Sequence, residues 1–61
     1  SDREHQVMLM IASGKTISEI AAELKLSVKT VRTFRARMLD KMNFRTNAEV
    51  TAYVLRNQLL P

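Results

Sequence analysis

The stretch "TISEIAAELKLSVKTVRTFRARML", Thr16 to Leu39, decides how this chain folds. Thr16 followed three residues later by Glu19 is a capping box, in which hydroxyl and carboxylate each bind an unpaired amide of a first helical turn. Ser27 is a second cap, without the carboxylate. Only a three-residue turn, 25–27, separates the two helices that these caps delimit. A connection so short forces the helix axes to cross steeply, which predicts a helix-turn-helix unit over about 17–36.

The remainder of the chain carries the same kinds of signal. Two further capping boxes precede apolar-periodic stretches, at Ser1 with Glu4 and at Thr46 with Glu49. Gly14 and Asn43 are residues that tolerate the left-handed conformation in which many helices end. We therefore predict helices over about 2–13, 17–24, 28–42 and 47–57. No stretch alternates apolar and polar residues as a strand would, so the predicted fold is an all-α, compact four-helix bundle.

Composition limits the class of protein. The 61 residues, 46% apolar and 26% charged, suit one soluble domain over 1–61, near the smallest size that folds alone. Without cysteine there is neither a disulfide framework nor a thiolate metal site. The longest apolar run, Val7 to Ala12, is too short to cross a bilayer. We expect a cytoplasmic protein with no membrane partner, and, since the chain starts at a helix cap without Met, a piece of a longer one.

Charge is segregated along the chain. Residues 1–24 carry two basic and four acidic side chains, whereas residues 25–41 carry six basic ones against a single aspartate. The remainder adds one net positive charge to reach the total of +4. Such a basic block is typical of a nucleic-acid binder, although it would equally attract an acidic protein or a membrane surface. Charge alone leaves these alternatives open.

The predicted third helix has two contrasting faces. At 100° per residue, its apolar side chains fall within an arc of about 140°, and they are Val28, Val31, Phe34, Met38, Leu39 and Met42. The opposite arc is basic at both edges, with the short Thr33 and Ala36 near its middle. Short central side chains let a helix enter the DNA major groove while flanking cations reach phosphates and Arg32 pairs with a guanine. A partner protein would instead need large anchors at the centre.

Arg35 departs from this pattern. It falls inside the apolar arc, and a buried guanidinium needs an acceptor because an unpaired buried charge is costly. Glu4, in the first turn of the first helix, is the partner that we predict for a structural ion pair with Arg35.

No catalytic or metal chemistry can be assembled from these residues. His5 has neither a cysteine nor a second histidine to share a metal ion. The chain also lacks a glycine-rich phosphate loop and a nucleophile that a histidine base could serve. We expect no enzymatic activity, no metal and no cofactor.

The chain resembles the LuxR type, also called the NarL/FixJ type, of DNA-binding domain along almost its whole length. The resemblance rests on R-E followed by V-x-x-x-I-A-x-G, then E-I-A-x-x-L, S-x-K-T-V, R-x-R-x-L-x-K-M and a closing A-E, in this order. It implies a bacterial transcription regulator, often of a two-component system, whose third helix enters the major groove. Three positions differ from the usual pattern: Phe34 replaces a histidine, Ile17-Ser18 a polar pair, and Gln58 a glycine that ends the last helix.

The angular positions of residues around the predicted third helix, together with the family resemblance, suggest residue roles and partners. The predicted base-facing residues are Lys29, Arg32, Thr33 and Ala36. The predicted phosphate contacts are Ser18, Lys25, Thr30, Arg37 and Lys41. The resemblance also implies a homodimer on inverted or direct repeats of double-stranded DNA, meeting through the last helix at Thr51, Val54 and Leu55. It further implies contact with RNA polymerase and an N-terminal receiver or signal-binding domain. The alternative is a helical interaction module whose basic face binds an acidic protein.

Overall fold

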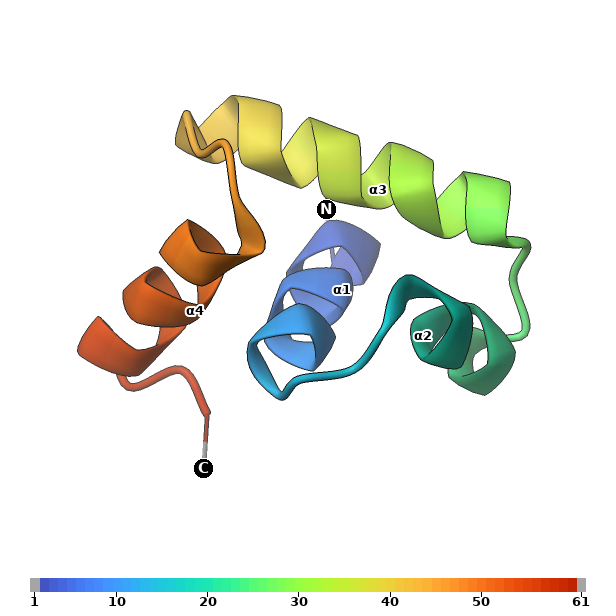
Figure 1. Cartoon of the computed structure of the whole chain (residues 1–61), viewed down its shortest axis with the longest axis horizontal. Helices are drawn as coiled ribbons and strands as arrows, with labels where there is room; N and C mark the ends of the chain where they lie inside the picture. Colours follow the sequence, from blue (N-terminus) through green and yellow to red (C-terminus); the bar gives the residue numbers. More distant parts are fainter. Residues whose placement is uncertain (1, 61) are drawn as a thin grey trace.

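A computed structural model describes residues 2–60. Over this range the chain forms four helices and no strand: α1 (Asp2–Ala12), α2 (Ile17–Leu24), α3 (Val28–Met42) and α4 (Asn47–Arg56) (Figure 1). The predicted all-α fold is confirmed, with α1 and α4 each ending one residue before the predicted limit. None of these helices is long and apolar enough to span a bilayer.

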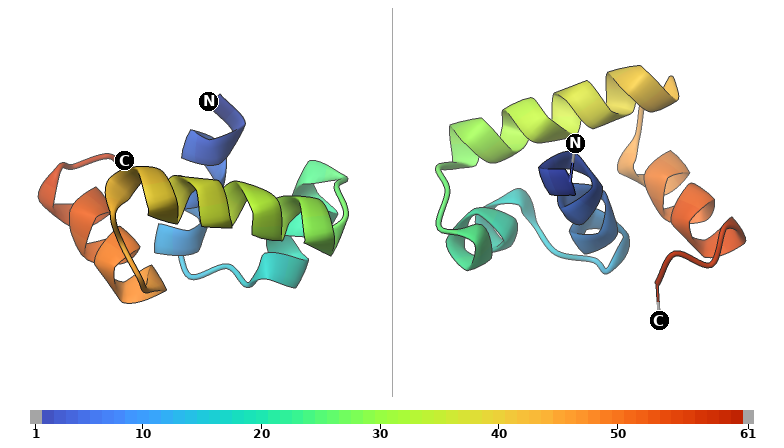
Figure 2. Two further views of the ribbon diagram at one scale, coloured as in Figure 1. Left: turned by 90° about the horizontal axis from the view of Figure 1, so that it is seen from above. Right: turned by 180° about the vertical axis from the view of Figure 1, so that it is seen from behind.

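The first helix stands at the centre of the arrangement. α1 packs against each of the other three helices, and α3 also packs against α2. Figures 1 and 2 show α3 crossing over α1, with α2 and α4 on either side of α1. Side chains from all four helices meet in one core, and the fully buried ones are Val7, Ile20, Val31, Val50 and Val54. Each helix therefore depends on the same core, as expected of a domain this small.

The predicted helix starts are present where the structure describes them. Capping boxes form at Thr16 and Thr46, each with the glutamate three residues on. At Ser27 the side chain accepts from the amide of Thr30 at 3.0 Å and donates to Thr30 Oγ1 at 2.8 Å. Thr30 thus fixes the orientation of the capping hydroxyl. The box predicted at Ser1 lies outside the described residues.

The helix ends share one geometry that the sequence reveals only in part. Each helix is followed by a residue with positive φ: Gly14 (89°), Lys25 (56°), Asn43 (58°) and Gln58 (54°). Gly14 and Asn43 are the predicted closing residues, whereas lysine and glutamine are uncommon in this region. A left-handed conformation costs a residue with a Cβ atom about 1–2 kcal/mol.

Backbone hydrogen bonds hold these strained residues in place. After α2, the amide of Leu26 donates to the carbonyl of Ala21 at 2.9 Å, and that of Lys25 to Ala22 at 3.3 Å. This pair of bonds is a Schellman motif, and the other three helix ends repeat it. Leu26 is itself partly buried against the core. An apolar residue just past the turn therefore helps to fix Lys25 in its left-handed conformation.

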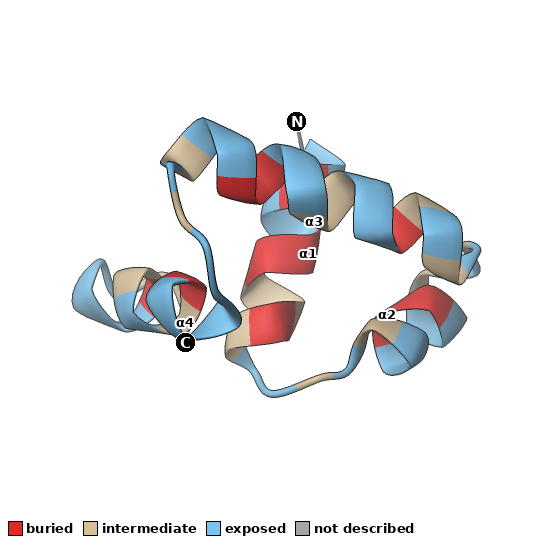
Figure 3. Cartoon of the chain, turned by 45° about the horizontal axis from the view of Figure 1, so that its top comes forward, coloured by how far each residue is buried: buried red, intermediate tan, exposed pale blue. Residues whose placement is uncertain are grey.

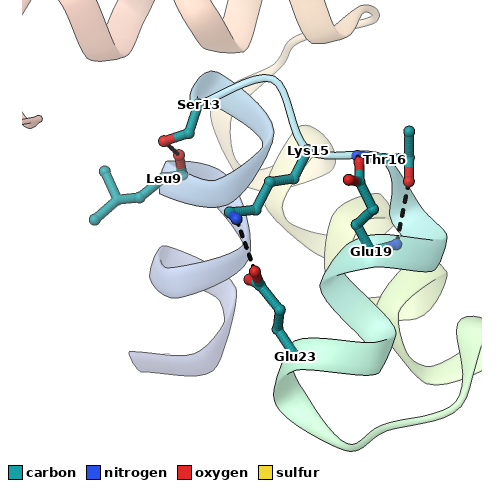
Figure 4. Close-up of polar contacts among 6 residues, drawn as sticks. All are labelled: Leu9, Ser13, Lys15, Thr16, Glu19 and Glu23. Atoms are coloured by element: carbon teal, nitrogen blue, oxygen red, sulfur yellow. Dashed lines mark hydrogen bonds and ion pairs between the residues drawn. The ribbon is translucent and has the colours of Figure 1, made fainter.

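The corner between α1 and α2 is tied by polar contacts at the surface (Figure 4). The Ser13 hydroxyl donates to the carbonyl of Leu9 at 2.8 Å, within the last turn of α1. Lys15 then reaches across to Glu23 on α2, where Nζ and Oε1 are 2.7 Å apart. The two side chains are 37% and 48% exposed, so this ion pair contributes little to stability.

Candidate nucleic-acid interface

The two faces predicted for α3 are present in the structure. Val31, Met38 and Leu39 are buried, and the rest of the predicted apolar arc is half-buried. Figure 3 shows exposed and buried segments alternating along α3, as expected of a helix with one buried side. The exposed residues of α3 are Lys29, Arg32, Thr33, Ala36, Arg37, Asp40 and Lys41. The core thus fixes which face of α3 is offered to a partner.

All four residues predicted to face DNA bases lie exposed on this surface. Lys29, Arg32, Thr33 and Ala36 are spaced by three and four residues, so they form one stripe along about two helical turns. The Thr33 hydroxyl donates to the carbonyl of Lys29 at 3.1 Å. This bond consumes the hydroxyl proton, so Thr33 offers a partner its methyl group and oxygen lone pairs. We call these four residues the readout stripe.

The residues predicted to contact phosphates surround the readout stripe. Ser18, Lys25, Arg37 and Lys41 are exposed, and Thr30 is half-buried. Because Thr30 Oγ1 accepts from Ser27, its own proton remains free to donate to a phosphate oxygen. Its rotamer is already set by that bond. Lys25 lies in the turn itself, where the strained backbone fixes the direction in which its side chain leaves.

Lys41 already has an anionic partner within the chain. Its Nζ donates to Oε1 of Glu4 at 2.8 Å, so the end of α3 is joined to the first turn of α1. The Glu4 side chain is only 10% exposed, whereas that of Lys41 is 62% exposed. The hydrogen bond from Lys41 is the main reason why the pKa of Glu4 lies below its ordinary value. Glu4 is therefore ionised at neutral pH.

The predicted ion pair of Glu4 with Arg35 is wrong, because each residue has a different partner. Arg35 is half-buried, and its Nε donates to Oδ1 of Asn47 at 2.9 Å, at the start of α4. Arg35 lies within the apolar arc of α3, whereas Lys41 lies just beyond one edge of that arc and reaches Glu4 from there. Arg35 thus connects α3 to α4, and its partial exposure lets a neutral amide serve as the acceptor.

One residue predicted for the dimer interface is also misplaced. Val54 is fully buried, because Val50 and Val54 form the stripe by which α4 packs on the core. It cannot contribute to an interface between two copies. Leu55 is the exposed large apolar residue of the described range, at 63%, while Thr51 is half-buried and donates its hydroxyl to the carbonyl of Asn47. Only Leu55 and Thr51 remain from the predicted set.

The sequence is similar to known bacterial regulators. The family described as "Bacterial regulatory proteins, luxR family" matches residues 1–54. The response regulator UvrY of Escherichia coli strain K12 is 44% identical over 59 residues, which are 97% of this chain and 27% of UvrY. The oxygen regulatory protein NreC of Staphylococcus carnosus is 37% identical over 60 residues, 98% of this chain and 28% of NreC.

The transcriptional regulatory protein LiaR of Bacillus subtilis is 36% identical over 58 residues, 95% of this chain and 28% of LiaR. This chain therefore spans little more than a quarter of the length of the three relatives. The family match covers all of α1, α2 and α3, including the exposed face of α3. The chain belongs to the luxR family of bacterial regulatory proteins, and its helix-turn-helix is that of a DNA-binding transcription regulator.

Proposed function

We propose that this chain is the output domain of a response regulator and binds specific sequences in double-stranded DNA with α3 in the major groove. The observation that carries the proposal is the readout stripe, which is exposed, combines the cations Lys29 and Arg32 with two short side chains, and has the exposed Arg37 beside it. A groove about 12 Å wide admits a helix whose central side chains are as small as Thr33 and Ala36. The buried face of α3 holds this surface rigidly on the bundle.

Each side chain of the stripe has a distinct chemical capacity. Arg32 offers a planar fork of donors that suits the two acceptors of a guanine. Thr33, whose proton is bound by Lys29, suits a thymine methyl group or a base amino group. Ala36 suits a thymine methyl group by apolar contact alone. Lys29 completes the stripe with a flexible side chain, whose ammonium group can reach a guanine or a phosphate over a range of positions.

The flanking residues position the helix rather than read the sequence. Ser18, Lys25, Thr30 and Arg37 would contact phosphates from α2, the turn and both ends of the stripe. Such contacts supply affinity that depends steeply on salt and carries no base preference. We propose that a homodimer places two copies of α3 on inverted or direct repeats, about one helical turn apart, with Leu55 at the contact between copies.

The complete regulator is proposed to hold further parts. UvrY is named a response regulator, and this chain corresponds to 27% of its length. We propose that the full-length protein has an N-terminal receiver or signal-binding domain, and that the DNA-bound dimer contacts RNA polymerase.

The test is a selection from a random duplex pool followed by a matched pair of variants. Arg32→Ala should cost about 1–3 kcal/mol mainly at one base position of the selected site. Arg37→Ala, which removes the same side chain from the edge of the stripe, should weaken binding to all duplexes alike. A selection that yields no preferred sequence would refute specific recognition. Displacement of the duplex by polyglutamate at equal charge concentration would instead support the acidic-protein alternative.

A further inference from the structure

A carboxylate stands at the edge of the surface that we assign to DNA. Glu4 comes from α1, and its Oε1 lies 2.8 Å from Nζ of Lys41 at the far end of α3. The field of Arg37, one turn earlier on the same edge, also lowers the pKa of Glu4. Lys41 is thus paired with an acidic residue on another helix, and the charge of Arg37, a second cation predicted to meet phosphates, also acts on that residue.

The geometry makes Lys41 difficult to transfer to a phosphate. The Glu4 side chain is only 10% exposed, so losing the bond from Lys41 would leave a poorly hydrated anion with one charge-assisted hydrogen bond fewer. That anion would then face the phosphates and repel them. Lys41 would merely exchange one anionic acceptor for another. The exchange is therefore unfavourable, although the Lys41 side chain is 62% exposed.

We propose that Glu4 is a positioning residue that holds Lys41 out of phosphate binding and so limits the affinity of this domain for DNA. This inference rests on the proposed function. It assigns Lys41 a different role from the phosphate contact that the sequence predicts. The Glu4–Lys41 pair then meets DNA as a neutral unit, and Arg37 is the last phosphate-binding cation along that edge of α3.

The salt dependence of binding gives a direct measure of this role. Each phosphate neutralised by a cation steepens the slope of log K against log salt by about 0.9. Glu4→Gln should release Lys41, tighten binding and add about one such contact. The advantage over the unmodified chain should shrink about 3.5-fold between about 50 and about 200 mM salt, because a fourfold increase in salt concentration raised to the power of about 0.9 gives this factor.

The experiment compares three forms of the domain on one duplex at several salt concentrations: unmodified, Glu4→Gln, and Glu4→Gln with Lys41→Met. The unmodified and doubly substituted forms should share one slope, and Glu4→Gln should be steeper by about 0.9. Two results would overturn the inference. One is a shallower slope for the double variant than for the unmodified chain, because Lys41 would then already bind phosphate. The other is equal affinity of the single and double variants, because the gain would then not pass through Lys41.

The matched control is Glu23→Gln. Glu23 is also paired with a lysine, Lys15, at 2.7 Å, but neither residue belongs to the surface that we assign to DNA. This variant gains the same net charge and should leave the slope unchanged. A purely structural role of Glu4 predicts a lower melting temperature with no steepening of the slope, so melting curves are recorded for every variant.

A measurement on the unmodified chain covers the case in which Glu4→Gln does not fold. The NMR signals of the Lys41 ammonium group should stay unchanged when DNA is added, while those of Lys29 shift. A shift of Lys41 as large as that of Lys29 would overturn the inference. Absence of any binding to duplex DNA by the unmodified chain is a separate result that would refute the proposed function itself.

Discussion

Replacing Lys25 by glycine should stabilise the domain and weaken its binding to DNA at the same time. Lys25 closes α2 with φ of 56°, in the turn that joins the two helices of the helix-turn-helix. Its side chain is exposed and is one of the proposed phosphate contacts. The backbone conformation of this residue and the charge of its side chain therefore affect two different measurements.

The magnitude follows from two opposing backbone contributions. A left-handed conformation costs a residue with a Cβ atom about 1–2 kcal/mol, and glycine avoids this cost. Glycine loses about 0.5–1 kcal/mol more conformational entropy on folding. The net gain in the free energy of unfolding is about 0.5–1 kcal/mol. For a domain of this size, that gain raises the melting temperature by about 2–8 °C.

Lys25→Ala is the matched variant, since it removes the same charge but keeps a Cβ atom at the strained position. It should melt close to the unmodified chain, whereas Lys25→Gly should melt higher. Both should reduce the slope of log K against log salt by about 0.9, on specific and random duplexes alike. Circular dichroism and fluorescence anisotropy supply the two measurements. Equal melting temperatures for the glycine and alanine variants would refute the strain argument.

Three other variants test separate contacts. Arg35→Ala should lower the free energy of unfolding by about 1 kcal/mol because it loses the bond to Asn47, without changing sequence preference; intact stability with lost DNA binding would make Arg35 a contact residue. The hydrogen bond from the amide of Thr16 holds the pKa of Glu19 below its ordinary value of 4.5. The Glu19 carboxylate therefore stabilises the fold fully above pH 4.5, and this contribution is lost as the pH falls through the lower pKa of the folded state. The melting difference between the unmodified chain and Glu19→Gln should accordingly vanish in acid, and a difference independent of pH would contradict this. Leu55→Asp should weaken binding to paired half-sites but not to a single one in a gel-shift assay, and equal loss on both would place Leu55 outside a dimer contact.

Local signals were sufficient to predict the helices and the faces of α3. Capping hydroxyls act within one turn, and the 3.6-residue period sorts side chains by angle about a single axis, so both can be read without knowing the fold. For this reason Thr16 and Ser27 correctly mark the starts of α2 and α3. The same period correctly places Val31 and Met38 in the core.

Contacts between helices could not be obtained in this way. A helical wheel gives the direction of Arg35 but not the helix that lies in that direction, and its acceptor Asn47 is 12 residues away. Glu4 and Lys41 are 37 residues apart. Val54 was misplaced for a related reason, because it is adjacent in sequence to Leu55 and only the packing of α4 shows which of the two faces the core. The DNA contacts themselves remain predictions.

The four helix ends have a consequence for how the chain folds. Every helix is closed by bonds between residues close in sequence, including those from Leu26 to Ala21 and from Phe44 to Leu39. The helix ends can therefore form before residues distant in sequence come into contact. What remains is the packing of α2, α3 and α4 onto α1. Chains dominated by such near-neighbour contacts fold in about microseconds to milliseconds. We expect rapid, single-exponential refolding from denaturant.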